Sequence, residues 1–122
     1  MREIVQKYIS AYNNFDIETM ISLMHNDCIF ESKHNNIVSL RTKGKPDFRQ
    51  ICNLSKNNYK YRKQIIENFN EYDNNIEVKL YFKATLAIDI PDLGKKDEQI
   101  SFETKSIFEF KNGLIYKLTH LD

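Results

Sequence analysis

Two hydroxyl side chains interrupt an otherwise apolar row near the C-terminal end of the chain, and they are the first candidates for chemistry. From Ile100 to Phe110, every second residue is apolar except Thr104 and Ser106. This period of two predicts a β-strand with one buried face. A buried hydroxyl needs a hydrogen-bond partner or must line a wet space. We therefore expect a ligand pocket beside these two residues.

The last predicted strand, residues 114–121, adds a side chain that can accept a proton. His120 lies near its end. A histidine titrates near neutral pH and can remove a proton from the carbon next to a carbonyl group. If Tyr116 and Leu118 face inward, His120 faces inward with them. The alternative is a partly exposed histidine close to the end of the chain.

Long strands must hold these residues in place. From Ile76 to Ile90 every even-numbered residue is apolar, which predicts one long antiparallel strand. Residues 59–72 form another extended segment, joined to it by a turn at 73–75. A longer loop, 91–97, leads to the strand that carries Thr104. Lys111-Asn112-Gly113 favours a tight turn with positive φ before the last strand.

The first half of the sequence predicts helices. Apolar residues at helical spacing run from Ile4 to Tyr12, and Asp16 is a good N-cap for a second helix that extends to Met24. A third helix begins around Pro46. Between them, 28–32 predicts a short strand and 33–43 an irregular polar segment.

The predicted order is α-α-β-α-β-β-β-β. Helices that precede a run of antiparallel strands indicate an α+β fold, with three N-terminal helices packed on one face of a curved sheet. The length of 122 residues corresponds to one domain.

Bulk composition excludes several classes of function. A net charge of +1 argues against nucleic acid as the main partner, and no apolar run reaches membrane-spanning length. The first residues enter a helical pattern and do not resemble a signal peptide, so we expect a cytoplasmic protein.

We expect Cys28 and Cys52 to be reduced thiols, with one bridge between them as the alternative. His25 and His34 lack metal-ligand spacing, and we expect neither metal nor cofactor.

Several segments together resemble the nuclear transport factor 2-like superfamily, which includes ketosteroid isomerases and SnoaL-type polyketide cyclases. They are Val5-Gln6-Lys7-Tyr8, residues 12–18, Asp27-Cys28-Ile29-Phe30-Glu31, Gly44 before the third helix, and residues 112–118. The resemblance covers nearly the whole chain, 1–122. It implies a cone in which helices close one end of a bent sheet, with an apolar pocket on the concave side and a homodimer through the outer face. It does not specify an activity, because this fold has many functions.

The resemblance also argues against one activity. Ketosteroid isomerases use an aspartate base, a tyrosine and a protonated aspartate. Tyr8 corresponds to the tyrosine, but the acid positions correspond to Ser32 and Ser106, while Glu31 should face the other way. Ketosteroid isomerase activity is therefore not expected. The polyketide cyclases use an acid or histidine nearer the end of the sheet, where this chain has His120 and Asp122.

These considerations give a candidate site. Tyr8 and His120 are the candidate catalytic residues, as oxyanion donor and base; in the alternative interpretation Tyr8 is a core residue. The candidate pocket residues are Tyr12, Phe30, Ser32, Phe48, Phe82, Phe102, Ser106, Phe108 and Leu118. Aromatic residues at such spacing are also typical of an ordinary core. The basic segment 60–63 is most simply a solvated face, and 33–43 could cover the pocket.

Three functions follow from these residues. The first is a SnoaL-like domain that binds a small, mostly apolar or carbonyl-bearing molecule. The second is a cofactor-independent isomerase, cyclase or lyase in which His120 takes a proton and Tyr8 stabilises the oxyanion. The third is an association module whose pocket is filled by its own side chains.

Overall fold

The computed structural model describes residues 1–122 and contains three helices and six strands. In chain order they are α1 (Arg2–Asn13), α2 (Ile17–Ser22), β1 (Met24–His34), β2 (Ile37–Lys43), α3 (Lys45–Lys56), β3 (Tyr59–Glu71), β4 (Asn75–Leu86), β5 (Gln99–Lys111) and β6 (Leu114–Leu121). None of the three helices is long and apolar enough to cross a membrane.

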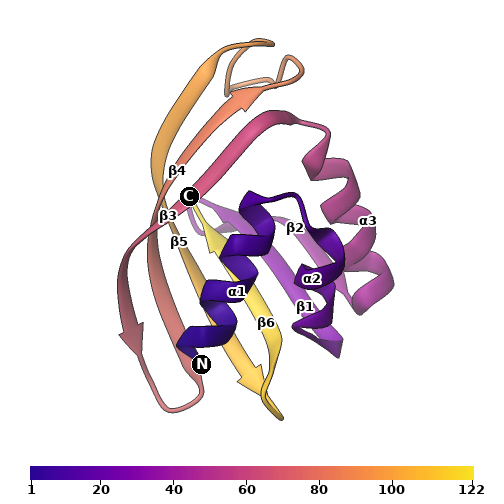
Figure 1. Cartoon of the computed structure of the whole chain (residues 1–122), viewed down its shortest axis with the longest axis vertical. Helices are drawn as coiled ribbons and strands as arrows, with labels where there is room; N and C mark the ends of the chain where they lie inside the picture. Colours follow the sequence, from indigo (N-terminus) through magenta and orange to yellow (C-terminus); the bar gives the residue numbers. More distant parts are fainter.

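All six strands form one curved sheet in the order β2-β1-β6-β5-β4-β3. Neighbouring strands are antiparallel except β1 and β6, which are parallel. The helices lie on one side of the sheet: α1 contacts β3 and α2, and α3 contacts β1 and β2 (Figure 1). The expected α+β architecture, with helices on the concave face of a mostly antiparallel sheet, is confirmed.

The hydrophobic core lies between the three helices and the middle of the sheet. As predicted, the even-numbered residues of β4 are buried: Ile76, Val78, Leu80, Phe82, Ala84 and Leu86. Ile76, Val78 and Leu80 belong to the same cluster as Val5 and Ile9 of α1. The buried face of β4, in which every second residue is apolar, therefore packs against the apolar face of α1.

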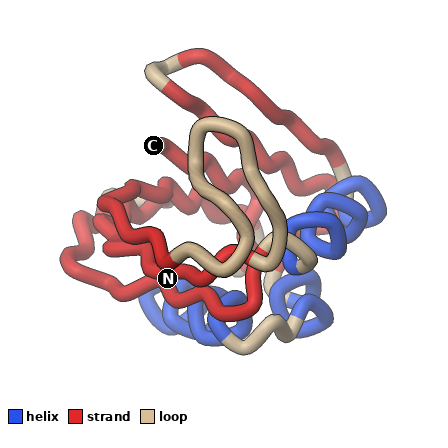
Figure 2. Tube along the Cα trace, turned by 90° about the horizontal axis from the view of Figure 1, so that it is seen from above, coloured by secondary structure: helices blue, strands red, loops and turns tan.

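Strand β4 is shorter than predicted, since it ends at Leu86 and not at Ile90. The chain turns back there: the Leu86 carbonyl accepts from the Asp97 N–H at 2.9 Å, and the Asp89 carboxylate accepts from the Lys96 N–H at 2.7 Å. These bonds close a loop, residues 87–98, which Figure 2 shows in tan from above. The apolar Ile88 is 47% exposed in this loop.

Residues 33–43 also differ from the prediction, because most of them belong to a β-hairpin. Asn35 and Asn36 have φ of 51° and 64°, which is the backbone of a two-residue hairpin turn that asparagine tolerates. Strand β2 follows the turn and pairs with β1. The second helix is accordingly shorter than expected, since β1 begins at Met24. Its predicted N-cap is confirmed: the Asp16 carboxylate accepts from the Thr19 N–H.

A bulge changes the inward phase of β6. Ile115 pairs with Phe110 and Lys117 pairs with Glu109, so Tyr116 is an extra residue on β6. Ile115 and Leu118 are therefore both buried. Tyr116 makes a T-shaped contact with the His25 ring, with the ring centres 5.5 Å apart. The expected inward phase holds for Leu118 but was wrong for Tyr116.

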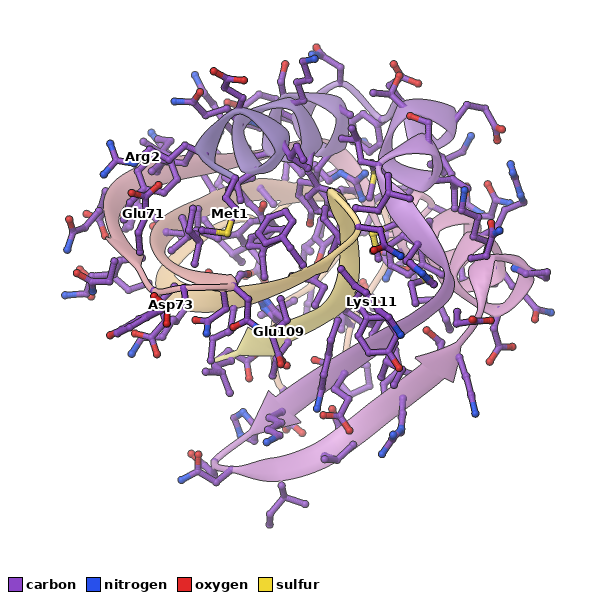
Figure 3. All side chains as sticks on the ribbon, turned by 90° about the horizontal axis from the view of Figure 1, so that it is seen from below. Met1, Arg2, Glu71, Asp73, Glu109 and Lys111 are labelled. Atoms are coloured by element: carbon purple, nitrogen blue, oxygen red, sulfur yellow. The ribbon has the colours of Figure 1, made fainter.

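The first turn of α1 contacts the C-terminal end of β3. The Arg2 side chain lies 3.2 Å from the Glu71 carboxylate and 4.8 Å from the centre of the Phe69 ring (Figure 3). This contact lies at the end of the sheet opposite the loop 87–98.

Candidate functional site

A cavity of about 550 Å³ lies between the concave face of the sheet and the helices, with 23 lining residues of which 14 are hydrophobic. Most of the sequence-predicted site residues line it: Tyr8, Tyr12, Phe30, Ser32, Phe48, Phe82, Phe102, Ser106, Leu118 and His120. Phe108 does not; it is buried in the core with its ring 5.5 Å from that of Tyr8, edge to face. Leu93, from the loop 87–98, also lines the cavity.

Aromatic rings form the apolar walls. Phe82 and Phe102 are register partners on β4 and β5, and their ring centres are 5.4 Å apart. Tyr59 meets Phe82 at 5.6 Å, and Phe30 meets Phe48 of α3 at 5.7 Å. Offset or edge-to-face contacts at such distances stabilise aromatic pairs. The rings consequently give the cavity well-packed sides.

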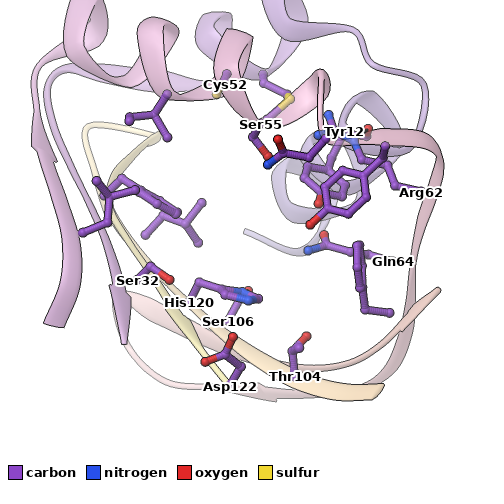
Figure 4. Close-up of a pocket in the computed structure, with 18 of the residues that line it drawn as sticks. Tyr12, Ser32, Cys52, Ser55, Arg62, Gln64, Thr104, Ser106, His120 and Asp122 are labelled. Atoms are coloured by element: carbon purple, nitrogen blue, oxygen red, sulfur yellow. Dashed lines mark hydrogen bonds between the residues drawn. The ribbon is translucent and has the colours of Figure 1, made fainter. Parts of the chain in front are cut away.

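One group of polar residues forms a row across three strands. His120 on β6 is the register partner of Ser32 on β1 and of Ser106 on β5. The Ser106 hydroxyl lies 3.5 Å from Nδ1 of His120. Asp122 follows at the end of β6, and Figure 4 shows all four residues together. Glu31, next to Ser32 in sequence, faces away from this row, as expected. Its carboxylate forms ion pairs with Arg41 and Lys117.

Burial keeps two candidate groups neutral. The pKa of His120 is lowered from its ordinary value of 6.5 by desolvation, which the Asp122 carboxylate partly opposes. Burial raises the pKa of Tyr8 well above its ordinary value. At neutral pH the site therefore offers an imidazole that can accept a proton and a phenol that can donate a hydrogen bond.

A second polar group was not predicted from the sequence. The sequence predicts a solvated face for the basic segment 60–63, but Arg62 is only 2% exposed. Arg62 is the register partner of Ala84 on β4, and Gln64 is the register partner of Phe82. Arg62 and Gln64 therefore both belong to the row of β3 that faces inward. The turn at residues 73–75 does not predict this, because the register of β3 with β4 shifts at a bulge between Ile66 and Asn68. Without that bulge, Arg62 would pair with Thr85, outside the buried row of β4.

Arg62 is held by the end of α1 and the turn that follows. Its Nε donates to the Tyr12 carbonyl at 2.9 Å, and its guanidinium carbon lies 3.7 Å from the Tyr12 ring centre and 4.4 Å from that of Phe15. Phe15 has φ of 56°, an unusual conformation for an aromatic residue. The Asn13 side chain fixes the same junction through two hydrogen bonds to the backbone of Gln64.

The hydroxyls that interrupt the apolar row of β5 both line the cavity, as predicted. Ser106 belongs to the row with His120. The Thr104 Oγ1 is buried without a hydrogen-bond partner. An unpartnered buried hydroxyl costs about 1–3 kcal/mol, so a ligand that supplied a partner would recover part of that cost.

The cysteines offer little reactivity. Both thiols are free and buried. Cys52 lines the cavity, but burial raises its pKa to about 12, and a protonated thiol is a poor nucleophile. No group of three or more His, Cys, Asp or Glu side chains is arranged to hold a metal ion.

The lowered pKa of His120 predicts a pH dependence of stability. Below about pH 6.5 the unfolded chain binds a proton that the folded chain does not, so the free energy of unfolding should fall as the pH decreases toward the folded pKa. The slope from this residue is at most about 1.4 kcal/mol per pH unit. Histidine NMR titration measures the pKa, with His120→Gln assigning the signal. Asp122→Asn should lower the pKa further; a wild-type value at or above 6.5 would contradict this.

No protein-family model matches the sequence, and no curated protein is significantly similar to it. Solved structures are similar in fold. A protein named a polyketide cyclase from Xanthomonas campestris pv. campestris superposes with a TM-score of 0.86 at 14% identity, covering 99% of this chain and 88% of that one. A protein named a SnoaL-like polyketide cyclase from Jannaschia sp. CCS1 gives 0.81 at 10% identity, covering 97% and 81%. TerC, crystallised with polyporic acid, gives 0.77 at 11% identity, covering 97% and 87%. The chain therefore has the cone-shaped nuclear transport factor 2-like fold of SnoaL-like polyketide cyclases.

Proposed function

We propose that the protein binds a small, mostly apolar organic molecule inside the cone. The observation that carries this proposal is the cavity of about 550 Å³ with a majority of hydrophobic lining residues and two separate polar groups. Sites for small molecules are typically roughly 300–1,000 Å³ in volume and combine apolar walls with a few polar groups. A cavity of this size argues against an association module filled by its own side chains.

Two further observations support binding. Thr104 lines the cavity and its buried hydroxyl has no hydrogen-bond partner, so a ligand with a polar atom that reached this hydroxyl would satisfy a group that the protein leaves unsatisfied. Among the structures of similar fold, TerC was crystallised with polyporic acid, an organic molecule. Both are consistent with a ligand that has an apolar body and polar substituents.

Filling the cavity should abolish binding. We expect 2-acetylnaphthalene, a carbonyl-bearing aromatic probe, to raise the stability of the wild type by about 1.4 kcal/mol at ten times its Kd. Ser106→Phe places a ring in the cavity and should remove this effect in a thermal-unfolding measurement. Ser101→Phe adds the same ring at an exposed position of the same strand and should leave it intact. Equal stabilisation of both variants would contradict binding in the cavity.

A second candidate function is a cofactor-independent isomerase, cyclase or lyase, and the shared position of His120 and Tyr8 in the cavity lining favours it. The neutral imidazole would remove a proton from the carbon next to a carbonyl group. The Tyr8 hydroxyl would donate a hydrogen bond to the enolate oxygen that forms. Ser32 and Ser106 provide no carboxylate, so ketosteroid isomerase chemistry stays outside this proposal.

Proton exchange tests the enzymatic candidate without knowledge of the substrate. We expect the protein to accelerate deuterium exchange at the α-carbon of 2-tetralone in D₂O, as measured by NMR. His120→Gln should slow the catalysed exchange by about 10²–10⁴-fold, and Tyr8→Phe should also slow it, while binding of 2-tetralone persists. His25→Gln, outside the cavity, is the control. Exchange that is independent of His120 would exclude this mechanism.

We also propose that two copies associate through the outer face of the sheet. Tyr61 and Ile65 on β3 are 49% and 38% exposed, and Ile65 pairs with the half-buried Tyr81 on β4. Light scattering should then give about twice the chain mass of 14.6 kDa. Ile65→Lys should produce monomers, whereas Ile37→Lys on the distant strand β2 should not. A wild-type monomer would refute the proposal.

A further inference from the structure

Arg62 is a buried cation that the protein does not pair with an acid. None of the six ion pairs in the structure includes it. Asp122 is the only acidic residue of the cavity lining, and it lies on the opposite side with His120 (Figure 4). Buried charges are normally paired, because an isolated charge loses its hydration.

The contacts that Arg62 does make compensate only part of this loss. Nε donates to the Tyr12 carbonyl in the last turn of α1, where the helix presents roughly half a negative charge. The Tyr12 and Phe15 rings lie against the guanidinium group, and such contacts favour a cation. A guanidinium group has five N–H donors, and the hydrogen bond to Tyr12 uses one of them.

A second polar side chain, beside Arg62, would help to hold an anion. Gln64, two residues further along the inward row of β3, directs its side-chain amide toward the middle of the cavity (Figure 4). Arg62 and Gln64 supply N–H donors, and planar guanidinium groups match the two oxygens of a carboxylate. This end of the cavity is therefore positively charged and rich in donors, while its walls are aromatic.

We infer that the ligand is an organic carboxylate whose acidic group is bound by Arg62, with its apolar body between the aromatic walls. This inference rests on the proposed binding function and narrows it to a class of ligand. The opposite end of the ligand then lies toward Ser106 and His120. A ligand with a positive charge at the Arg62 end would be excluded by repulsion.

Three probes of nearly equal shape separate charge from size: 2-naphthoate, 2-naphthamide and (2-naphthyl)methylammonium. Calorimetry at pH 7 should show that the wild type binds 2-naphthoate at least about tenfold more tightly than 2-naphthamide, and the ammonium compound most weakly. Arg62→Gln should remove the preference and leave the affinity for 2-naphthamide within about threefold. Arg62→Lys should keep part of it, because lysine retains the charge without the planar fork.

Lys63→Gln is the matched control, since it removes one charge from the exposed face of the same strand. It should preserve the preference. A preference that persists in Arg62→Gln, or that Lys63→Gln removes equally, would overturn the inference, and so would equal affinity of the wild type for 2-naphthoate and 2-naphthamide. In that last case ligand binding still stands.

Failure of the proposed function gives a different result, namely that none of the three probes binds the wild type. Circular dichroism establishes whether Arg62→Gln is folded. Should that variant unfold, the order of the three affinities in the wild type and in Arg62→Lys decides: carboxylate above amide above ammonium supports the inference, and any other order overturns it.

Discussion

The register of β4 against its two neighbours determines which side chains reach the interior. It places Arg62 and Gln64 of β3 beside Ala84 and Phe82, and on the other side it sets Thr104 opposite Leu80. A shift of one residue would turn each of these side chains to the outer face. The apolar row of β4 forms the hydrophobic core with α1. The polar residues in the inward rows of β3 and β5, namely Arg62, Gln64 and Thr104, line the cavity.

The cavity separates two kinds of chemistry. At one end, burial holds the His120 imidazole neutral, and the row of serines beside it offers hydroxyls but no carboxylate. At the other end, Arg62 remains charged because guanidinium groups do not lose their proton in proteins. The strained backbone of Phe15 brings an aromatic ring against that charge. A molecule with an acidic group and a carbonyl group at its two ends would complement both.

Much of the fold and part of the site could be predicted from the sequence, and the errors have physical causes. The alternation of β4 and the hydroxyl of Thr104 within an apolar row were sufficient to predict a dry face and a pocket. Arg62 was missed because burial of an arginine is costly, so a basic segment normally predicts exposure. The hairpin at Asn35 depends on a left-handed turn that asparagine permits but does not require. The bulge at Tyr116 arises from pairing between strands, which no local pattern records.

A crystal structure of the protein with 2-naphthoate would show where a bound acid lies in the cavity and in which direction its carboxylate points. We expect the naphthalene rings to lie between Phe82 and Phe102 on one side and Phe30 and Phe48 on the other, with the carboxylate within hydrogen-bond distance of the Arg62 guanidinium group. A carboxylate turned toward His120, or a probe bound only outside the cone, would contradict this expectation.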